Sequence, residues 1–246
     1  MPVPPTFEAR VVENRPLTPG VRELTFERAA GDPFEFEAGQ WVSLVLPLPS
    51  GELRRSYSIA SPPSAGSPRF QIAVTHVEGG PGSSFLHGLT LGDRLRVIGP
   101  QGFFTRPLEG AGPALFVATG TGVTPLRSML HAAIARGHTA PITLVLGVRR
   151  EEDLLYGDEL TELARAHAGR VRFEPTLSRG DEAWSGRRGY VQTHVRELWD
   201  DLVARCGGAA PHAYVCGLQK MVGTVRDLLR KDMQVTRQQV HSERYD

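Results

Sequence analysis

The chain has 246 residues, of which 40% are hydrophobic and 22% are charged, and its formal net charge is +1. This composition is typical of a globular protein with one large or two smaller domains. The balanced charge argues against nucleic acid as a partner, because phosphate backbones attract a basic excess. No apolar run reaches the roughly 18 residues that a membrane span needs. The N-terminus also lacks the apolar core of a signal peptide, so we expect a cytoplasmic protein.

The cysteines and histidines limit the metal chemistry that this chain can support. Only Cys206 and Cys216 are present, whereas an iron–sulfur cluster usually needs four thiolates. A disulfide framework is equally unexpected, and small buried residues are the simplest interpretation of both cysteines. The eight histidines have no metal-binding spacing. We therefore expect no metal site.

The first half of the chain has the pattern of short β-strands. Apolar and β-branched residues alternate or cluster over five stretches, which are 7–15, 21–28, 40–48, 70–77 and 93–100. Stretches rich in Pro, Gly and Ser separate them. Short strands with frequent turn signals predict an antiparallel β-barrel or sandwich.

The pattern changes near residue 111 to strands that alternate with helices. Buried-type strands are predicted at 114–120, 142–148, 171–177 and 213–217, and helices at 157–167, 191–206 and 219–232. A further helix is expected to begin with Thr124 as its N-cap and Pro125 as its first residue, and to stop at Gly137. This alternation predicts a parallel sheet covered by helices. The change falls within 106–113, which divides the chain into domains 1–108 and 109–246.

A glycine-rich loop, GTGVTP at 120–125, joins the first of these strands to the following helix. Ligands bind at the carboxyl ends of strands in parallel sheets. Gly120 and Gly122 would let the backbone approach a pyrophosphate, and the N–H groups of the helix start would attract its charge. Pro125 departs from the G-x-G-x-x-G pattern, so a tight turn without a ligand remains the alternative.

The stretch RSYS at 55–58, which is followed by IAS, resembles the flavin-binding strand of the ferredoxin–NADP⁺ reductase superfamily. That strand carries an R-x-Y-[ST] motif in an antiparallel barrel, here spanning Arg55, Ser56, Tyr57 and Ser58. The resemblance implies that Arg55 neutralises the flavin pyrophosphate, that Tyr57 lies against the isoalloxazine ring, and that Ser58 hydrogen-bonds near flavin N5. The alternative is an edge strand with solvated polar side chains.

A second phosphate site is implied by the stretch GGPGSS at 79–84. It matches the superfamily's G-x-x-S pattern, with a short helix expected behind it at 85–89. Its candidate donors are Gly80, Gly82, Ser83 and Ser84. A Gly/Ser turn without a ligand is the alternative.

The C-terminal part completes the resemblance. YVCG at 214–217 is similar to the superfamily's Cys–Gly pair beside the nicotinamide, which implicates Cys216 and Gly217. The final SERYD is similar to the glutamate and aromatic residue near the end of many members. Tyr245 would cover the second flavin face and move aside for the nicotinamide, while Glu243 would act as a proton relay near N5. Asp246 follows the aromatic residue, and a frayed polar tail is the alternative.

The choice of pyridine nucleotide depends on arginines in the second half. In bacterial-type ferredoxin or flavodoxin reductases, arginines at matching positions clamp the 2′-phosphate of NADP(H). Here they would be Arg149, Arg179 and Arg187, with a hydroxyl from Ser178. Thr121, Thr124 and Pro125 of the glycine loop would also contact the nucleotide. Surface salt bridges are the alternative for the arginines, and NADH-linked relatives can carry the same Ser-Arg pair.

The resemblance therefore implies an FAD-dependent oxidoreductase that transfers hydride between NADP(H) and flavin N5. Without cluster cysteines, single electrons would pass to a separate carrier, ferredoxin or flavodoxin. FAD rather than FMN follows from the family pattern alone. Two alternatives remain: an NADH-linked reductase component that serves an oxygenase in trans, and a non-catalytic flavin-binding regulatory subunit. Nothing in the sequence indicates a coiled coil, and we expect a monomer.

Overall fold

The computed structural model describes residues 4–107, 109 and 111–245, which form two compact units. The first unit comprises Met1–Arg106 and Arg127–Ala132, and the second comprises Pro107–Leu126 and Ala133–Asp246. The boundary expected from the sequence, between 108 and 109, involves residue 108, which lies outside the described residues. That boundary stays a prediction.

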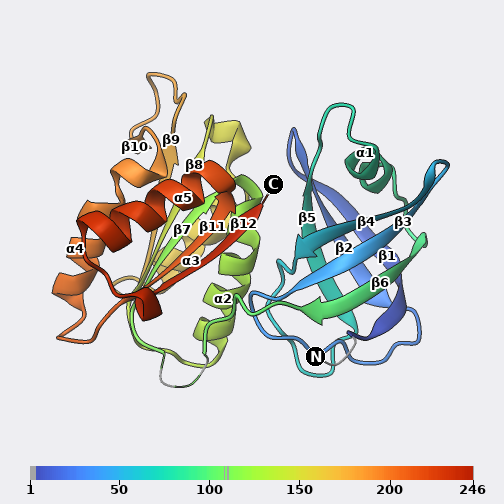
Figure 1. Ribbon diagram of the computed structural model, residues 1–246, viewed down its shortest axis with the longest axis horizontal. Coiled ribbons are helices and arrows are strands. Elements are labelled where there is room, and N and C mark those ends of the chain that lie inside the picture. Colours follow the sequence, from blue (N-terminus) through green and yellow to red (C-terminus); the bar gives the residue numbers. More distant parts are fainter. Residues whose placement is uncertain (1–3, 108, 110, 246) are drawn as a thin grey trace. The chain divides into compact units, whose positions relative to one another are not determined.

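The first unit is built on a six-stranded antiparallel sheet with the strand order β4-β3-β6-β1-β2-β5. Its edge strands β4 and β5 contact each other, and the sheet curls into a barrel (Figure 1). A short helix, α1, lies between β5 and β6 along the chain. The elements are β1 Thr6–Thr18, β2 Val21–Arg28, β3 Trp41–Leu48, β4 Gly51–Ser58, β5 Arg69–Thr75, α1 Pro81–His87 and β6 Arg94–Gln101. The expected antiparallel barrel is confirmed, although α1 begins four residues before the predicted helix.

The barrel encloses a core of aromatic and aliphatic side chains. Phe26 and Phe70 stack with their ring centroids 5.5 Å apart, and both are fully buried. Leu86 of α1 is also fully buried in this core, so the helix is held by its apolar face. Burying one such leucine stabilises the fold by about 1.5–3 kcal/mol. The core thereby fixes α1 beside β4, the strand that carries the predicted flavin motif.

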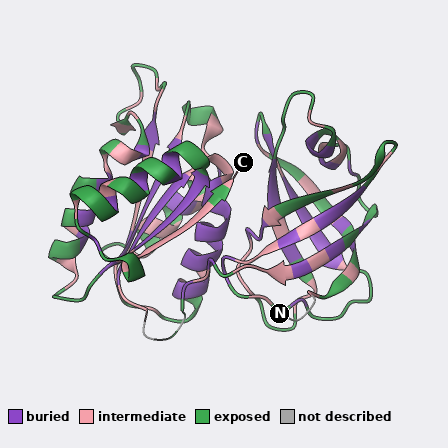
Figure 2. Cartoon of the chain, viewed as in Figure 1, coloured by how far each residue is buried: buried purple, intermediate pink, exposed green. Residues whose placement is uncertain are grey.

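The second unit contains a six-stranded parallel sheet with the order β10-β9-β8-β7-β11-β12. Its strands are β7 Ala114–Thr119, β8 Ile142–Val148, β9 Val171–Leu177, β10 Arg187–Arg188, β11 His212–Leu218 and β12 Val240–Tyr245. The central strands are buried on both faces (Figure 2), which explains their nearly continuous apolar sequences. The four predicted strands are confirmed. The edge strands β10 and β12 were not predicted, and β12 replaces the frayed tail that was the alternative for the C-terminus.

Helices cover both faces of this sheet. They are α2 Val123–Ala135, α3 Gly157–Ala166, α4 Val195–Arg205 and α5 Gln219–Asp227, which continues as a π-helix over Leu228–Asp232. The helices α4 and α5 pack on one face through a shared apolar cluster. The helix α2 follows a 3₁₀ turn at Gly120–Gly122, so Thr124 lies in its first turn and is not its N-cap, contrary to expectation. Among the described residues, no helix is long and apolar enough to cross a membrane.

Candidate functional site

In the first unit, the start of α1 packs directly on the strand that carries Arg55. Residues 53, 55 and 57 of β4 share one face, because side chains alternate along a strand. A Cβ atom added at Gly82 would lie 3.2 Å from Leu53 Cδ2 and 3.4 Å from Arg55 Cγ. Glycine therefore allows the helix start to approach the stem of the arginine. The structure thus brings together two stretches that the resemblance assigned to the flavin phosphates.

Tyr57 lies on the same face of β4, partly buried against the barrel core. Burial raises the pKa of the Tyr57 phenol to about 12, although the charge of Arg55 acts in the opposite direction. The phenol is therefore neutral at physiological pH. A neutral, flat and partly exposed ring is suited to stacking on another aromatic ring.

The serines of these two stretches differ in what their hydroxyls contact. Ser83 is buried, and its Oγ accepts from the Val77 N–H at 3.0 Å and donates to the Gly80 carbonyl at 3.0 Å. This hydroxyl fastens the turn that precedes α1. Ser56 Oγ lies 3.2 Å from Ser43 Oγ, and Ser58 is buried. Ser84 is exposed, so it offers a more accessible hydroxyl than Ser83 does.

In the second unit, the glycine turn packs against the backbone at the end of β11. A Cβ atom added at Gly122 would lie 2.6 Å from the Cys216 carbonyl carbon and 2.7 Å from Gly217 Cα. Such distances are shorter than any real contact, so only glycine fits at position 122. Gly120 has a φ of 52°, a left-handed conformation that glycine adopts without strain. The turn and β11 thus form one compact backbone cradle.

Thr119, the last residue of β7, was missed by the sequence analysis. Its Oγ1 is buried and has no hydrogen-bond partner within the part of the chain that the structure describes. Leaving such a group unsatisfied costs about 1–3 kcal/mol, which a polar ligand would offset. The available signal was a hydroxyl at the carboxyl end of a predicted strand, directly before the glycines. This orphan hydroxyl beside a glycine cradle fits a dinucleotide.

The C-terminal strand β12 brings two predicted residues, Glu243 and Tyr245, to the same cradle. In the parallel register, Cys216 pairs with Glu243, and Leu218 pairs with Tyr245. Tyr245 Oη lies 3.3 Å from Thr124 Oγ1. Burial raises the pKa of the Cys216 thiol, the nearby Glu243 charge raises it further, and a hydrogen bond with Tyr245 opposes both. The thiol is consequently neutral.

Two of the predicted arginines lie side by side at the carboxyl ends of β8 and β9. The Arg179 N–H donates to the Arg149 carbonyl at 2.8 Å, and the Ser178 N–H donates to the Val148 carbonyl at 3.0 Å. Both arginines are exposed, and neither forms a salt bridge with any described residue. Two unpaired guanidinium groups next to a serine hydroxyl are suited to binding a phosphate.

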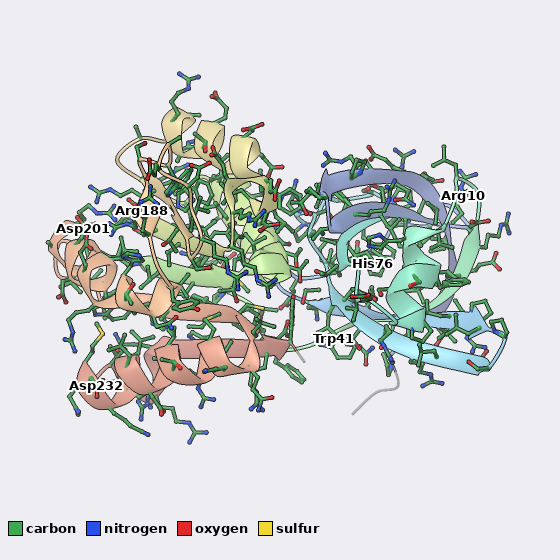
Figure 3. All side chains as sticks on the ribbon, turned by 90° about the horizontal axis from the view of Figure 1, so that it is seen from above. Arg10, Trp41, His76, Arg188, Asp201 and Asp232 are labelled. Carbon is green, nitrogen blue, oxygen red and sulfur yellow. The ribbon has the colours of Figure 1, made fainter. Side chains whose placement is uncertain are left out.

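Arg187 is placed differently, in a network of carboxylates. Its Nε lies 2.9 Å from Glu174 Oε2, and its two terminal nitrogens donate to both oxygens of Glu197 at 2.8 and 2.9 Å. The bidentate bond with Arg187 lowers the pKa of Glu197. Arg187 is thus engaged by two carboxylates in this structure, as the salt-bridge alternative expects, and its role at the 2′-phosphate stays a prediction. The neighbouring Arg188, labelled in Figure 3, donates to three backbone carbonyls and so anchors the 180–184 loop.

Comparison with known proteins matches both halves of the chain to domain families. Residues 8–105 match the oxidoreductase FAD-binding domain, and residues 116–227 match the oxidoreductase NAD-binding domain. Over 240 residues the chain is 59% identical to ferredoxin–NADP reductase B of Sorangium cellulosum, with 98% of each protein covered. The chain belongs to the ferredoxin–NADP reductase superfamily. The resemblance that the sequence motifs carried is thereby confirmed, as are the oxidoreductase class and the pairing of FAD with a pyridine nucleotide.

Other members of the ferredoxin–NADP reductase superfamily extend the comparison. The chain is 36% identical to the reductase component of a phenol 2-monooxygenase from Pseudomonas, over 77% of this chain and 52% of that protein. It thus spans about half the length of that relative. A ferredoxin–NADP⁺ reductase from Neisseria gonorrhoeae, solved with bound FAD and NADP, shares the fold with a TM-score of 0.81 and 21% identity, over 97% of this chain and 98% of that one. The roles of individual site residues stay predictions.

Proposed function

We propose that the protein is an FAD-dependent NADPH reductase that supplies electrons to a separate carrier, ferredoxin or flavodoxin. The observation that carries the choice of NADPH is the exposed, unpaired couple Arg149 and Arg179 at the ends of β8 and β9. A free ribose diol is usually bound by a carboxylate, whereas a 2′-phosphate is bound by arginine. The name of the 59% identical relative supports the same choice.

The chain's own residues would bind and orient the two cofactors. Arg55 and the N–H groups at the start of α1 would hold the FAD diphosphate, and the Tyr57 ring would support the flat flavin ring. Thr119 and the Gly120–Gly122 turn would hold the pyridine nucleotide. The cofactors supply the redox chemistry, a hydride transfer between nicotinamide C4 and flavin N5. Glu243 would hold a proton close to that site.

The arginine couple gives the coenzyme choice a direct test. Replacing both Arg149 and Arg179 with serine should raise the KM for NADPH by about 10- to 100-fold, because each charge-assisted contact is worth about 1.5–3 kcal/mol and exposure weakens it. The KM for NADH should change less than twofold. Arg165→Ser, at an exposed arginine of α3 paired with Glu162, is the matched control, and we expect little change in either KM. Equal effects of the double variant on both nucleotides would contradict the assignment.

The second candidate function is that of a reductase component that serves an oxygenase. It is favoured by the 36% identity to the reductase component of a phenol 2-monooxygenase. Steady-state rates with NADPH and NADH separate the two, since a strong NADH preference would support the second. A purified holoprotein whose flavin neither nucleotide bleaches would support the regulatory-subunit alternative.

The monomeric state and the cytoplasmic location are also part of this proposal. Light scattering tests the monomeric state, and cell fractionation tests the location.

A cavity on the second unit suits an acidic carrier. It measures about 460 Å³ and is lined by Arg226, Arg230, Arg237, Val240 and Ser242. No described carboxylate forms a salt bridge with these three arginines. Arg230 Nη1 donates to the Val235 carbonyl at 3.0 Å, which fixes one guanidinium in place. Positive charge gathered without a partner would attract the carboxylates of a carrier protein.

A further inference from the structure

The phenol of Tyr245 is tied to the glycine turn by a chain of two hydrogen bonds. Thr124 Oγ1 donates its only proton to the Thr121 carbonyl at 2.8 Å. Its contact with Tyr245 Oη at 3.3 Å must therefore have the phenol as the donor. The order of donation is Tyr245 to Thr124 to Thr121. The C-terminal aromatic ring is thus connected to the turn that would hold the nucleotide.

Burial distinguishes this role of Thr124 from direct contact with a ligand. Thr124 is 2% exposed, so its hydroxyl faces protein atoms rather than a ligand surface. Tyr245 is only half-buried and ends an edge strand that, among the described strands, pairs with β11 alone. Its phenol contacts the Cys216 thiol and Thr124. The hydrogen bond with Thr124 therefore contributes to the position of the ring.

We propose that Thr124 is a positioning residue that latches Tyr245, so that the nicotinamide must break the phenol–Thr124 hydrogen bond before it can stack. This inference rests on the proposed function, in which Tyr245 covers the flavin until the nucleotide arrives. When only a fraction of the protein is in the binding-competent state, the apparent affinity for the ligand falls in proportion to that fraction. One hydrogen bond between neutral groups shifts such an equilibrium by about 2- to 10-fold. The latch would tune nucleotide affinity by that factor.

The test measures binding to the FAD-loaded holoprotein by isothermal titration calorimetry, with two ligands. NADP⁺ has the nicotinamide that must displace the ring, while 2′-phospho-ADP-ribose lacks it. Thr124→Val and Tyr245→Phe each remove the hydrogen bond and keep the shape of the side chain. Each should tighten NADP⁺ binding by about 2- to 10-fold and leave the fragment's affinity unchanged.

Two further variants separate the latch from other roles of Thr124. The double variant Thr124→Val with Tyr245→Phe should bind NADP⁺ no more tightly than Tyr245→Phe alone, because the loss of the phenol has already removed the bond that Thr124→Val would remove. Tyr245→Phe also removes the hydrogen bond with the Cys216 thiol, so Tyr245→Phe is the reference for this comparison. Thr124→Ser keeps the hydroxyl and should behave like the wild type. Thermal unfolding midpoints, measured for every variant, verify that each one is folded.

Three results would overturn the latch. They are unchanged NADP⁺ affinity in Tyr245→Phe, additive effects in the double variant, and weaker binding of both ligands in Thr124→Val alone, which would make Thr124 a direct ligand. Failure of the proposed function is recognised separately, because NADPH would then not bleach the flavin of the wild-type holoprotein. The binding comparison can be interpreted in either case.

Discussion

Tyr57 illustrates how one residue combines packing with chemistry. Its ring packs on the barrel core, and the same burial keeps its phenol neutral by raising the pKa to about 12. The ordinary phenol pKa is near 10. The folded protein therefore holds a proton between about pH 10 and 12 that the unfolded chain has already released.

The sign of the resulting pH dependence follows from that difference. The unfolded state binds fewer protons in this window, so the stabilisation from neutral Tyr57 is complete below about pH 10. It is lost as the pH rises through about 12. Subtracting the ultraviolet titration of Tyr57→Phe from that of the wild type should leave one phenolate step near pH 12. A difference step near pH 10 would contradict the burial of this ring.

At the residue scale, the sequence could not predict which of the three candidate arginines form salt bridges. Arg149, Arg179 and Arg187 were equivalent in the sequence, because residue type and position in the motif were the only criteria. The structure separates them through Glu174 and Glu197, which come from β9 and α4. Neither carboxylate precedes or follows Arg187 closely in the chain. Only the tertiary packing of those elements decides which guanidinium stays free.

At the scale of elements, the buried strands of the parallel sheet could be predicted and its edge strands could not. The strand β7 has a continuous apolar sequence, because both of its faces are covered. The strand β12 is half-buried along its length and polar, and it exists because its backbone pairs in parallel with β11. A local pattern carries no signal for a partner nearly thirty residues away. The motifs near Tyr245 were therefore recognised while the strand that carries them was not.

The glycine turn gives a prediction at this scale. Gly122→Ala would push a methyl group into the backbone of Cys216 and Gly217, at 2.6–2.7 Å. Overpacking of this kind costs about 1–3 kcal/mol and would displace the turn, so we expect a lower unfolding midpoint and at least tenfold weaker NADP⁺ binding. Calorimetry and thermal unfolding measure both effects.

Gly223 in α5 supplies the matched control for that prediction. A Cβ atom added there meets nothing within 4 Å, so Gly223→Ala should stabilise the protein by about 0.5–1 kcal/mol through helix propensity. Its NADP⁺ affinity should equal that of the wild type. If Gly122→Ala had the same unfolding midpoint as Gly223→Ala, this result would contradict the close packing of the turn against β11.

At the scale of the whole molecule, the formal net charge of +1 conceals a local excess of positive charge. Arg226 and Arg230 are one helical turn apart, and Arg237 lines the same cavity. Like charges at this spacing destabilise a helix by about 0.2–0.5 kcal/mol. Since no described carboxylate forms a salt bridge with Arg226 or Arg237, we interpret the cluster as a surface for an acidic partner.

Charge reversal of this cavity tests how a carrier is recruited. With an acidic plant-type ferredoxin as acceptor, the double variant Arg226→Glu and Arg237→Glu should raise the KM for the carrier by about tenfold at low salt. Added salt should reduce the difference in KM for the carrier between the variant and the wild type, because salt screens the interaction of exposed charges beyond about 10 Å. Reduction of ferricyanide by NADPH should be unchanged, since neither arginine is among the residues proposed to hold the cofactors. Arg230 is left in place because it supports the Val235 carbonyl.

The control for charge reversal is Arg165→Glu on α3, which makes the same kind of change at an exposed arginine paired with Glu162. It should leave the KM for ferredoxin within twofold of the wild type. A basic cytochrome c used as acceptor should respond with the opposite sign, because the reversed cavity would attract it. Arg165→Glu changes the net charge by half as much as the double cavity variant does. If it raised the KM for ferredoxin as much as Arg226→Glu alone or Arg237→Glu alone, the carrier would respond to overall charge, and the arginine cavity would not be its docking site.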